Sequence, residues 1–539
     1  MKTYSLSSNV RVVPFVNSWF AHPYLISPVT FGLYTKYAHL EMLESFIDNP
    51  RQHRISSTTP ALRGGPFINY TGDPADVARF RDDTLERCAL GLHAADAISA
   101  MYQLLLAQAK GSGMQGLYGQ IDELIRQGID LSYDVCKQPG ARFIEPVFYQ
   151  GPLCDTSLQT CVLERATYEP RTFVLSTPQI RPPESSVTIE LPFGDPLWDE
   201  LYGGSADRDA LVQRLTPYLD DPARTAPILA EMLLERRAPA DAAAWPHDTV
   251  RIRYFGHACV LMQCAGVSIL IDPLISYPGE AKIDHFTFDD LPDRIDYVLI
   301  THPHQDHIVL ETLLRLRHKI DQVVVGRAGG GGLADVSLMH VLQHCGFTRV
   351  TELGEYESLT FDGGRILGAP FYGEHAELDI RTKLAYGVEL KQTRCLFFAD
   401  SNPPAPEFYE PLKRLMGHID CLFLGMECVG APATWLYGPL LQKMLTRGED
   451  QSRRLDGCDA AKALAMQQFF DPSRLFIYAM GAEPWLTHIT SILYSEEMTQ
   501  FKEARRVEST LRPQGKSAEL LFGKMELHLD DQGAQRRSA

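Results

Sequence analysis

The sequence lacks a regular cysteine pattern and any long hydrophobic run. Its 11 cysteines include no C-x-x-C pair, and several, such as Cys259 and Cys421, lie in apolar segments. This arrangement is typical of buried, reduced thiols in a cytosolic protein rather than of a disulfide framework. No segment approaches 18 consecutive apolar residues, and the N-terminus has no basic region followed by an apolar stretch. We therefore expect a soluble, cytoplasmic protein.

Positive charge is scarce. The chain has 51 Lys and Arg against 68 Asp and Glu, a formal net charge of -17. This balance argues against nucleic acid or an anionic membrane as a general partner, because neither is attracted to an acidic protein. Two motifs are also missing: there is no G-x-S-x-G nucleophile elbow, and the glycines at 329–332 are not followed by the Lys-Ser/Thr of a phosphate loop. Covalent acyl-enzyme chemistry therefore has little support.

The length of 539 residues predicts two domains, because a single core rarely grows so large. Residues 1–245 mix helical and strand patterns without a catalytic motif. Asp73 is a candidate N-cap with Pro74 at the first helical position, and residues 142–149 resemble an edge strand. We predict a separate α+β domain here, used for dimerisation or partner docking. The proline-containing segment 238–246 is the candidate linker.

Residues 246–539 are richer in strand patterns. Short apolar runs such as 297–301, 395–400 and 475–480 have strand length, and helical patterns separate several of them. Early hairpin strands followed by alternating strands and helices favour mixed sheets covered by helices. We predict that this part is an α/β catalytic domain.

A metal-binding pattern follows one of these strands. The segment 301–307 reads Thr-His-Pro-His-Gln-Asp-His and brings together His302, His304, Asp306 and His307. Neutral imidazole and carboxylate ligands suit zinc, iron or manganese. Neighbouring side chains point in different directions, so one ion is not expected to take all four. The spacing predicts two adjacent metals, with the first two histidines on one and the aspartate and last histidine on the other.

Later strand ends offer further ligands. Asp400 ends an apolar strand and is predicted to bridge the two metals, because a shared carboxylate lowers the repulsion between close cations. His488 follows another strand and is a candidate for the second metal. Asp272 is predicted to contact a ligand imidazole and fix its orientation without binding a metal itself. His257 is a weaker candidate for the site. It either contacts a metal ligand or is simply a histidine at a strand end.

Two adjacent residues, Glu374 and His375, are alternatives for the last protein ligand of the first metal. His375 would give an all-imidazole set that suits zinc. Glu374 would give two histidines and a carboxylate, a set suited to iron and oxygen chemistry. The spacing does not choose between them.

Four motifs together carry a family resemblance. The segments at 254–258 (Tyr-Phe-Gly-His-Ala), 270–273 (Leu-Ile-Asp-Pro) and 301–307, with Asp400, resemble the metallo-β-lactamase superfamily over roughly residues 249–525. That resemblance implies an αββα sandwich with metals at the edges of the sheets.

Three further features narrow the resemblance. They are the long N-terminal domain, Gly373-Glu374 where the superfamily usually has a metal-binding histidine, and the late His488. In these the chain is similar to the chloramphenicol-pathway β-hydroxylase family. Members are dinuclear iron oxygenases that hydroxylate the β-carbon of an amino acid held as a thioester on a nonribosomal peptide synthetase carrier domain.

Carried over residue by residue, this resemblance implies two iron ions with O2 as co-substrate. One iron would be bound by His302, His304 and Glu374, the other by Asp306, His307 and His488, with Asp400 between them. His375 and His418 are alternatives to His488. Glu427, just past another strand, is a candidate catalytic or substrate-side carboxylate.

The resemblance also implies partners. They are a carrier domain with its aminoacyl-phosphopantetheine arm and a second copy of the chain. No Rossmann or flavin motif is visible, so electrons are expected from a separate reductase. Carrier domains are usually acidic, so docking requires a local basic patch, either 315–319 or Arg447 with Arg453 and Arg454.

The alternative reading is a dinuclear zinc hydrolase, in which His375 completes the first site and metal-bound hydroxide attacks an ester, thioester, lactone or phosphodiester.

Overall fold

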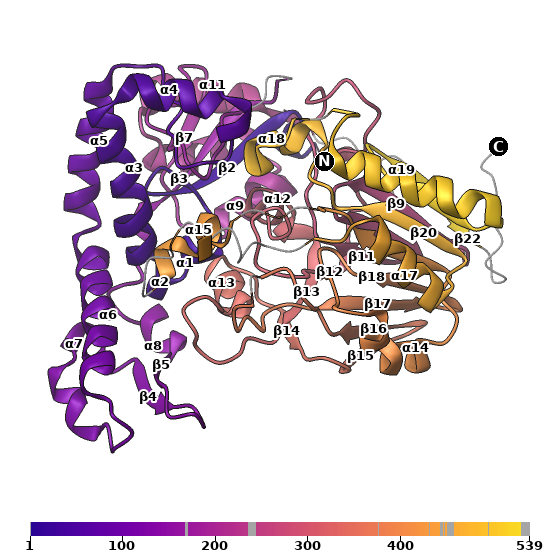
Figure 1. Ribbon diagram of the computed structural model, residues 1–539. Helices are drawn as coiled ribbons and strands as arrows, with labels where there is room; N and C mark the ends of the chain where they lie inside the picture. The colour runs from indigo at the N-terminus through magenta and orange to yellow at the C-terminus, as the bar shows by residue number, and fades with distance from the viewer. Residues whose placement is uncertain are drawn as a thin grey trace.

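The computed structural model describes most of the chain (Figure 1). The described residues are 2–167, 171–235, 244–375, 377–428, 430, 432–441, 446, 448–449, 457–493 and 495–529. The predicted linker at 238–246 lies largely outside the described residues. So do Arg447, Arg453 and Arg454 of the second predicted basic patch.

Two seven-stranded mixed sheets form the C-terminal part of the protein. The first has the order β14-β13-β12-β11-β10-β9-β22, and the second has the order β15-β16-β17-β18-β19-β20-β21. The strands of the first sheet are β9 (Val250–Gly256), β10 (Cys259–Cys264), β11 (Val267–Ile271), β12 (Ile295–Leu299), β13 (Ile320–Gly326), β14 (Val350–Leu353) and β22 (Met525–Leu529). Those of the second are β15 (Ser358–Phe361), β16 (Gly364–Ala369), β17 (Ala385–Leu390), β18 (Thr393–Phe397), β19 (Cys421–Gly425), β20 (Arg474–Tyr478) and β21 (Ser517–Leu520).

The sheets pack face to face with helices outside. Side chains from both sheets, such as Ile252, Val324 and Phe423, share one buried core. A second core joins the outer face of the second sheet to α14 (Glu410–Met416), α17 (Ala460–Phe470) and α19 (Thr499–Leu511). The helices α12 (Leu310–Leu316) and α13 (Leu338–His344) cover the first sheet. The predicted αββα sandwich is therefore confirmed.

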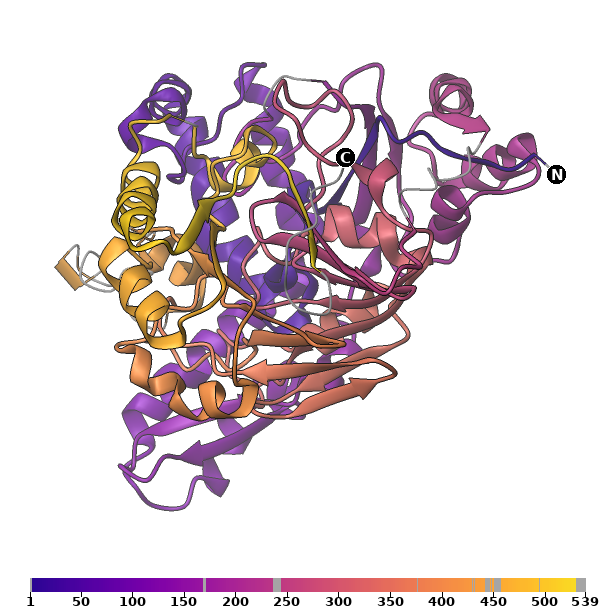
Figure 2. The same cartoon turned by 90° about the vertical axis from the view of Figure 1, so that its right-hand side faces the viewer.

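The N-terminal part has its own four-stranded sheet, of order β3-β2-β6-β7, and a column of helices beside the sandwich (Figures 1 and 2). The strands are β2 (Val10–Val16), β3 (Trp19–Phe20), β6 (Gln159–Arg165) and β7 (Val187–Ile189), and the main helices are α2 (Pro28–Tyr34), α3 (Glu41–Asp48), α5 (Pro74–Arg87) and α6 (Ala89–Gln108). Asp73 caps α5 as predicted, because its carboxylate accepts a hydrogen bond from Ala75 N. The predicted strand at 142–149 is only partly right: β5 (Pro139–Phe143) ends before most of it, and Pro146 lies in the first turn of α8 (Glu145–Tyr149).

Helix α6 is long and apolar enough to cross a membrane by length and composition, and one such helix is weak support for a membrane span. It packs closely along α2. A Cβ added to Gly32 would lie 1.9 Å from the carbonyl oxygen of Gly91, so only glycine allows the two backbones to approach this closely.

Buried arginines join the N-terminal part to the sandwich. Arg317 donates hydrogen bonds to the carbonyl oxygens of Phe193 and Asp195, and Arg315 donates to those of Ser7 and Val10. Both guanidinium groups are buried. The first predicted basic docking patch, 315–319, is therefore wrong, because its arginines are used inside the protein to satisfy backbone carbonyls.

Candidate metal centre

The loop after β12 is fixed by a buried carboxylate. Asp272, just past β11, accepts hydrogen bonds from Thr301 N (2.8 Å) and Thr301 Oγ1 (2.6 Å). Its Oδ2 also lies 2.8 Å from His307 Nδ1. The prediction that Asp272 orients a candidate ligand imidazole is confirmed, and this contact leaves His307 Nε2 as the nitrogen available to a metal.

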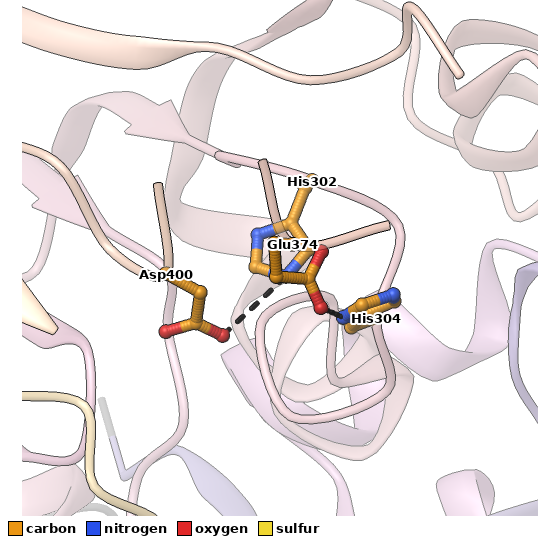
Figure 3. Close-up of side chains that lie close together, drawn as sticks. All are labelled: His302, His304, Glu374 and Asp400. Carbon is orange, nitrogen blue, oxygen red and sulfur yellow. Dashed lines mark ion pairs between the residues drawn. The ribbon is translucent and has the colours of Figure 1, made fainter. Parts of the chain in front are cut away.

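Four buried residues form the first candidate group (Figure 3). One ligand atom from each of His302, His304, Glu374 and Asp400 lies within 4.8 Å of the others. His304 Nδ1 is 3.0 Å from Glu374 Oε1, and His302 Nε2 is 3.7 Å from Asp400 Oδ2. The loop after β16 presents Glu374 at a positive φ of 64°, a left-handed conformation that costs energy for a residue with a side chain.

The second candidate group lies beside the first. It consists of His257, Asp306 and His307, and His257 Nε2 is 3.2 Å from Asp306 Oδ2. Asp400 Oδ2 lies 3.1 Å from His307 Nε2, while it is 3.7 Å from His302 Nε2 in the first group. One carboxylate oxygen therefore reaches an imidazole of each group, the position that a bridging ligand requires.

Buried polar atoms without hydrogen-bond partners indicate that the two groups bind cations. Within the described residues, His302 Nε2, His307 Nε2 and Asp400 Oδ1 are buried without a hydrogen-bond partner. Burying a polar atom without a partner costs free energy, and a bound cation would interact with all three atoms. Burial opposes ionisation of Glu374, but the imidazoles of His304 and His375 hold its pKa well below the ordinary value. The donor set, imidazole nitrogens and carboxylates, fits iron or zinc.

His375 lies outside the first group. Its Nδ1 is 2.8 Å from the Tyr437 hydroxyl, and its Nε2 is 2.9 Å from Glu374 Oε2. The same hydroxyl lies 2.9 Å from His304 Nε2. Burial lowers the pKa of His375 to about 4, so its ring is neutral. Tyr437, on α15 (Ala433–Tyr437), thus connects His304 to His375, and no pattern in the sequence signals it.

The structure does not bring His488 to the second group. Strand β20 ends at Tyr478, and the residues that follow it at the site are Ala479, Met480 and Gly481. His488 comes a turn later, on α18 (Thr487–Thr490), and its ring meets the edge of Phe20, with ring centroids 6.3 Å apart. His418 is 62% exposed and lies beside Ser473 instead. Among the described residues, His257 takes the third place in the group.

A cavity of about 120 Å³ opens beside both groups. Glu427 lies in its wall, and burial, followed by the charges of Asp400 and Glu374, raises the pKa of this carboxyl well above its ordinary value. The N-terminal part contributes Leu175 to the same wall. The full lining is Leu175, His257, Gln305, Asp306, Asp400, Glu427, Ala479, Met480, Gly481, Ile489, Thr490 and Ile492.

Known proteins share this combination of parts. A family model described as "Diiron non-heme beta-hydroxylase N-terminal domain" matches residues 5–235, and one described as "Beta-lactamase superfamily domain" matches residues 268–434. Over 534 residues, 98% of this chain, the sequence is 31% identical to the whole of the 4-amino-L-phenylalanyl-CmlP-peptidyl-carrier-protein 3-hydroxylase of Streptomyces venezuelae. The chain belongs to the diiron non-haem β-hydroxylase family.

A solved structure agrees with this assignment. The crystal structure of CmlA, a diiron β-hydroxylase from Streptomyces venezuelae, matches 98% of this chain and 100% of that chain with a TM-score of 0.90 and 30% identity. The predicted enzyme class, a non-haem diiron oxygenase that uses two irons and O2, is therefore confirmed. A UPF0173 protein of Pyrococcus abyssi is 30% identical over 176 residues, which is 32% of this chain and 69% of that protein. Because the relation to the hydroxylase extends over nearly the whole chain, the zinc-hydrolase alternative is not favoured.

Proposed function

We propose that this diiron hydroxylase adds a hydroxyl group to the β-carbon of an amino acid held as a thioester on a nonribosomal peptide synthetase carrier domain, in natural-product biosynthesis. The name of the Streptomyces relative describes an aminoacyl group on a peptidyl carrier protein as its substrate. The observation that carries the proposal is the place of Glu374 beside His302 and His304, with Asp400 reaching the second group. A carboxylate-rich pair of sites suits iron and oxygen chemistry.

The proposed ligands follow the two groups. His302, His304 and Glu374 hold one iron, Asp306 and His307 hold the other, and Asp400 lies between them. Their contacts and their unsatisfied atoms support this assignment.

We propose that His257 positions Asp306 instead of binding iron. Its Nδ1 accepts a hydrogen bond from Gly481 N at 3.2 Å, so in the neutral ring the proton sits on Nε2. That nitrogen lies 3.2 Å from Asp306 Oδ2. A protonated nitrogen has no lone pair to offer a metal.

The irons, when bound, supply the O2 activation that an unactivated C–H bond requires. The chain contributes placement and protons. Burial and the charges of Asp400 and Glu374 raise the pKa of the Glu427 carboxyl in the cavity wall, which favours its protonated form and suits it to give a proton to a reacting oxygen. Leu175, Met480 and Ile489 make part of that wall apolar and limit the entry of water.

The remaining partners are proposals of the same kind. Residues 1–245 serve dimerisation or carrier docking and residues 246–539 serve catalysis, an arrangement supported by Leu175, which brings the N-terminal part to the cavity. Electrons come from an external reductase. A cytoplasmic location fits the cysteines, since the 11, all among the described residues, form no disulfide.

The test uses iron-loaded, reduced protein, O2 and a panel of aminoacyl-phosphopantetheinyl carrier domains, with mass spectrometry of the arm. We expect the tethered amino acid to gain one oxygen atom, with the thioester intact. The matched free amino acids are the control and should stay unchanged. Release of the amino acid by thioester cleavage, with no oxygen gained on any carrier, would show that the proposed function is wrong.

A further inference from the structure

A series of buried aromatic side chains leads from the first metal group into the N-terminal part. Tyr437, whose hydroxyl contacts His304, lies 6.2 Å from Tyr24 between ring centroids. Tyr24 in turn stacks on Tyr34, with centroids 5.5 Å apart and rings inclined by only 22°.

The series continues to a tryptophan. Tyr34 lies 6.5 Å from the ring of His39, and His39 stacks on Trp19 at 3.9 Å with an angle of 6° between the rings. Trp19 is 1% exposed. Burial and the neighbouring His22 hold the pKa of His39 well below its ordinary value, so the ring against the indole is neutral.

Phenol and indole are oxidised more easily than the phenyl ring of phenylalanine, and consecutive rings in this series, with His39 between Tyr34 and Trp19, have centroids at most 6.5 Å apart. We propose that the series Tyr437–Tyr24–Tyr34–Trp19 delivers single electrons to the oxidised iron centre when O2 has reacted with no substrate bound. The metal ligands are thereby spared from oxidation. The inference rests on the iron and O2 chemistry of the family, and it does not depend on which amino acid is hydroxylated.

The first step has a defined destination for the proton. With the irons bound and oxidised, Tyr437 would give up one electron, and its hydroxyl proton would move to His375 Nδ1 at 2.8 Å. The products are a neutral phenoxyl radical and an imidazolium. That imidazolium lies with Nε2 only 2.9 Å from the Glu374 carboxylate, which offsets its charge.

The second step restores the tyrosine. One electron from Trp19 passes the rings of Tyr34 and Tyr24 and reduces the Tyr437 radical, while His375 returns its proton. In sum, the series would supply one electron to the oxidised irons, Trp19 would be left as its radical cation, and no proton would be gained or lost. The neutral ring of His39 imposes no positive charge on that cation.

The experiment exposes iron-loaded, reduced protein to O2 without substrate and freezes it at intervals for EPR spectroscopy. We expect an organic radical whose hyperfine pattern changes in protein grown with ring-deuterated tyrosine or tryptophan. The Tyr437→Phe variant should lose the tyrosyl signal and keep its iron, measured as metal content. Tyr202→Phe is the matched control, because Tyr202 is a buried tyrosine stacked on Trp198, outside the series. That variant should keep the wild-type signal.

A second readout does not require the radical to accumulate. After repeated exposure to O2, peptide mass spectrometry should find more oxidation at the loop 301–307 in Trp19→Phe than in wild type or Tyr202→Phe. Trp19 lies at the opposite end of the series from the candidate ligands, so this variant decides the matter if Tyr437→Phe fails to fold or to load iron. The proposal is overturned if the radical survives in Tyr437→Phe. It is equally overturned if loop oxidation in Trp19→Phe equals that of the control.

Discussion

The buried carboxylate of Asp272, which contacts the loop 301–307, allows a quantitative prediction about iron affinity. Asp272 is fully buried and meets three donors: the backbone N–H and hydroxyl of Thr301, and His307 Nδ1. The substitution Asp272→Asn keeps the shape but replaces one acceptor oxygen with an NH2 group. In place of Oδ2 that group faces His307 Nδ1, so the imidazole loses the partner that fixes its proton on Nδ1; in place of Oδ1 it faces Thr301 N, and the backbone of the metal loop loses its acceptor.

The expected loss follows from the role of such partners. Removing the carboxylate behind a metal-binding histidine typically lowers metal affinity about 10- to 100-fold, which corresponds to about 1.4–2.7 kcal/mol. The folded protein should also lose about 1–3 kcal/mol, because a buried donor is left without an acceptor. The loss of affinity should fall on the iron held by His307.

The assay is iron retention against a competing chelator, read as metal content and as the rate of iron release. Asp420→Asn is the matched control, since Asp420 is a buried carboxylate that accepts a hydrogen bond from Arg394 N at 2.8 Å, before β19. We expect the control to lose stability but to retain iron like the wild type. If Asp272→Asn retains both irons as tightly as Asp420→Asn, the role given to Asp272 is wrong.

Three further predictions follow. Glu374→Ala should lose the iron of the first group, whereas His375→Ala should keep both irons with weaker binding; metal analysis that shows the reverse order would favour His375 as ligand. His488→Ala should retain both irons, since the ring lies against Phe20, and loss of the second iron would restore its predicted role. Burial raises the pKa of Glu145 to about 7 from 4.5, so the folded chain holds this proton more tightly and stability should fall as pH rises between these values. In Glu145→Gln this part of the fall should be absent, measured by urea unfolding at about pH 5 and about pH 8; an unchanged pH profile would contradict the assignment.

The parts of the site that the sequence predicts well are local. The segment 301–307 carries four candidate ligands in one loop, and the strand before it places them at a sheet edge. Asp272 and Asp400 each follow an apolar run directly, so the end of the strand predicts where the carboxylate lies. The αββα sandwich likewise follows from short apolar runs separated by helical patterns.

The parts that the sequence does not predict depend on contacts between distant segments. Spacing cannot separate Glu374 from His375, because neighbours in a loop differ only in which way the backbone turns them, here at a φ of 64° for the glutamate. Tyr437 lies on α15, 133 residues after His304 in the sequence. The arginines at 315 and 317 resemble a solvated helix face until the N-terminal part is packed over them.

The last described strand of the chain has a consequence for biosynthesis. Strand β22 pairs with β9, with Met525 opposite Tyr254, and β9 lies between β22 and β10. A ribosome must therefore synthesise the chain through residue 529 before this edge of the first sheet is covered. Until then β9 presents an unpaired, apolar edge to other nascent chains, a recognised route to aggregation. Yield in a heterologous host should depend on chaperone supply during this interval, and an affinity tag is better placed at the N-terminus than after β22.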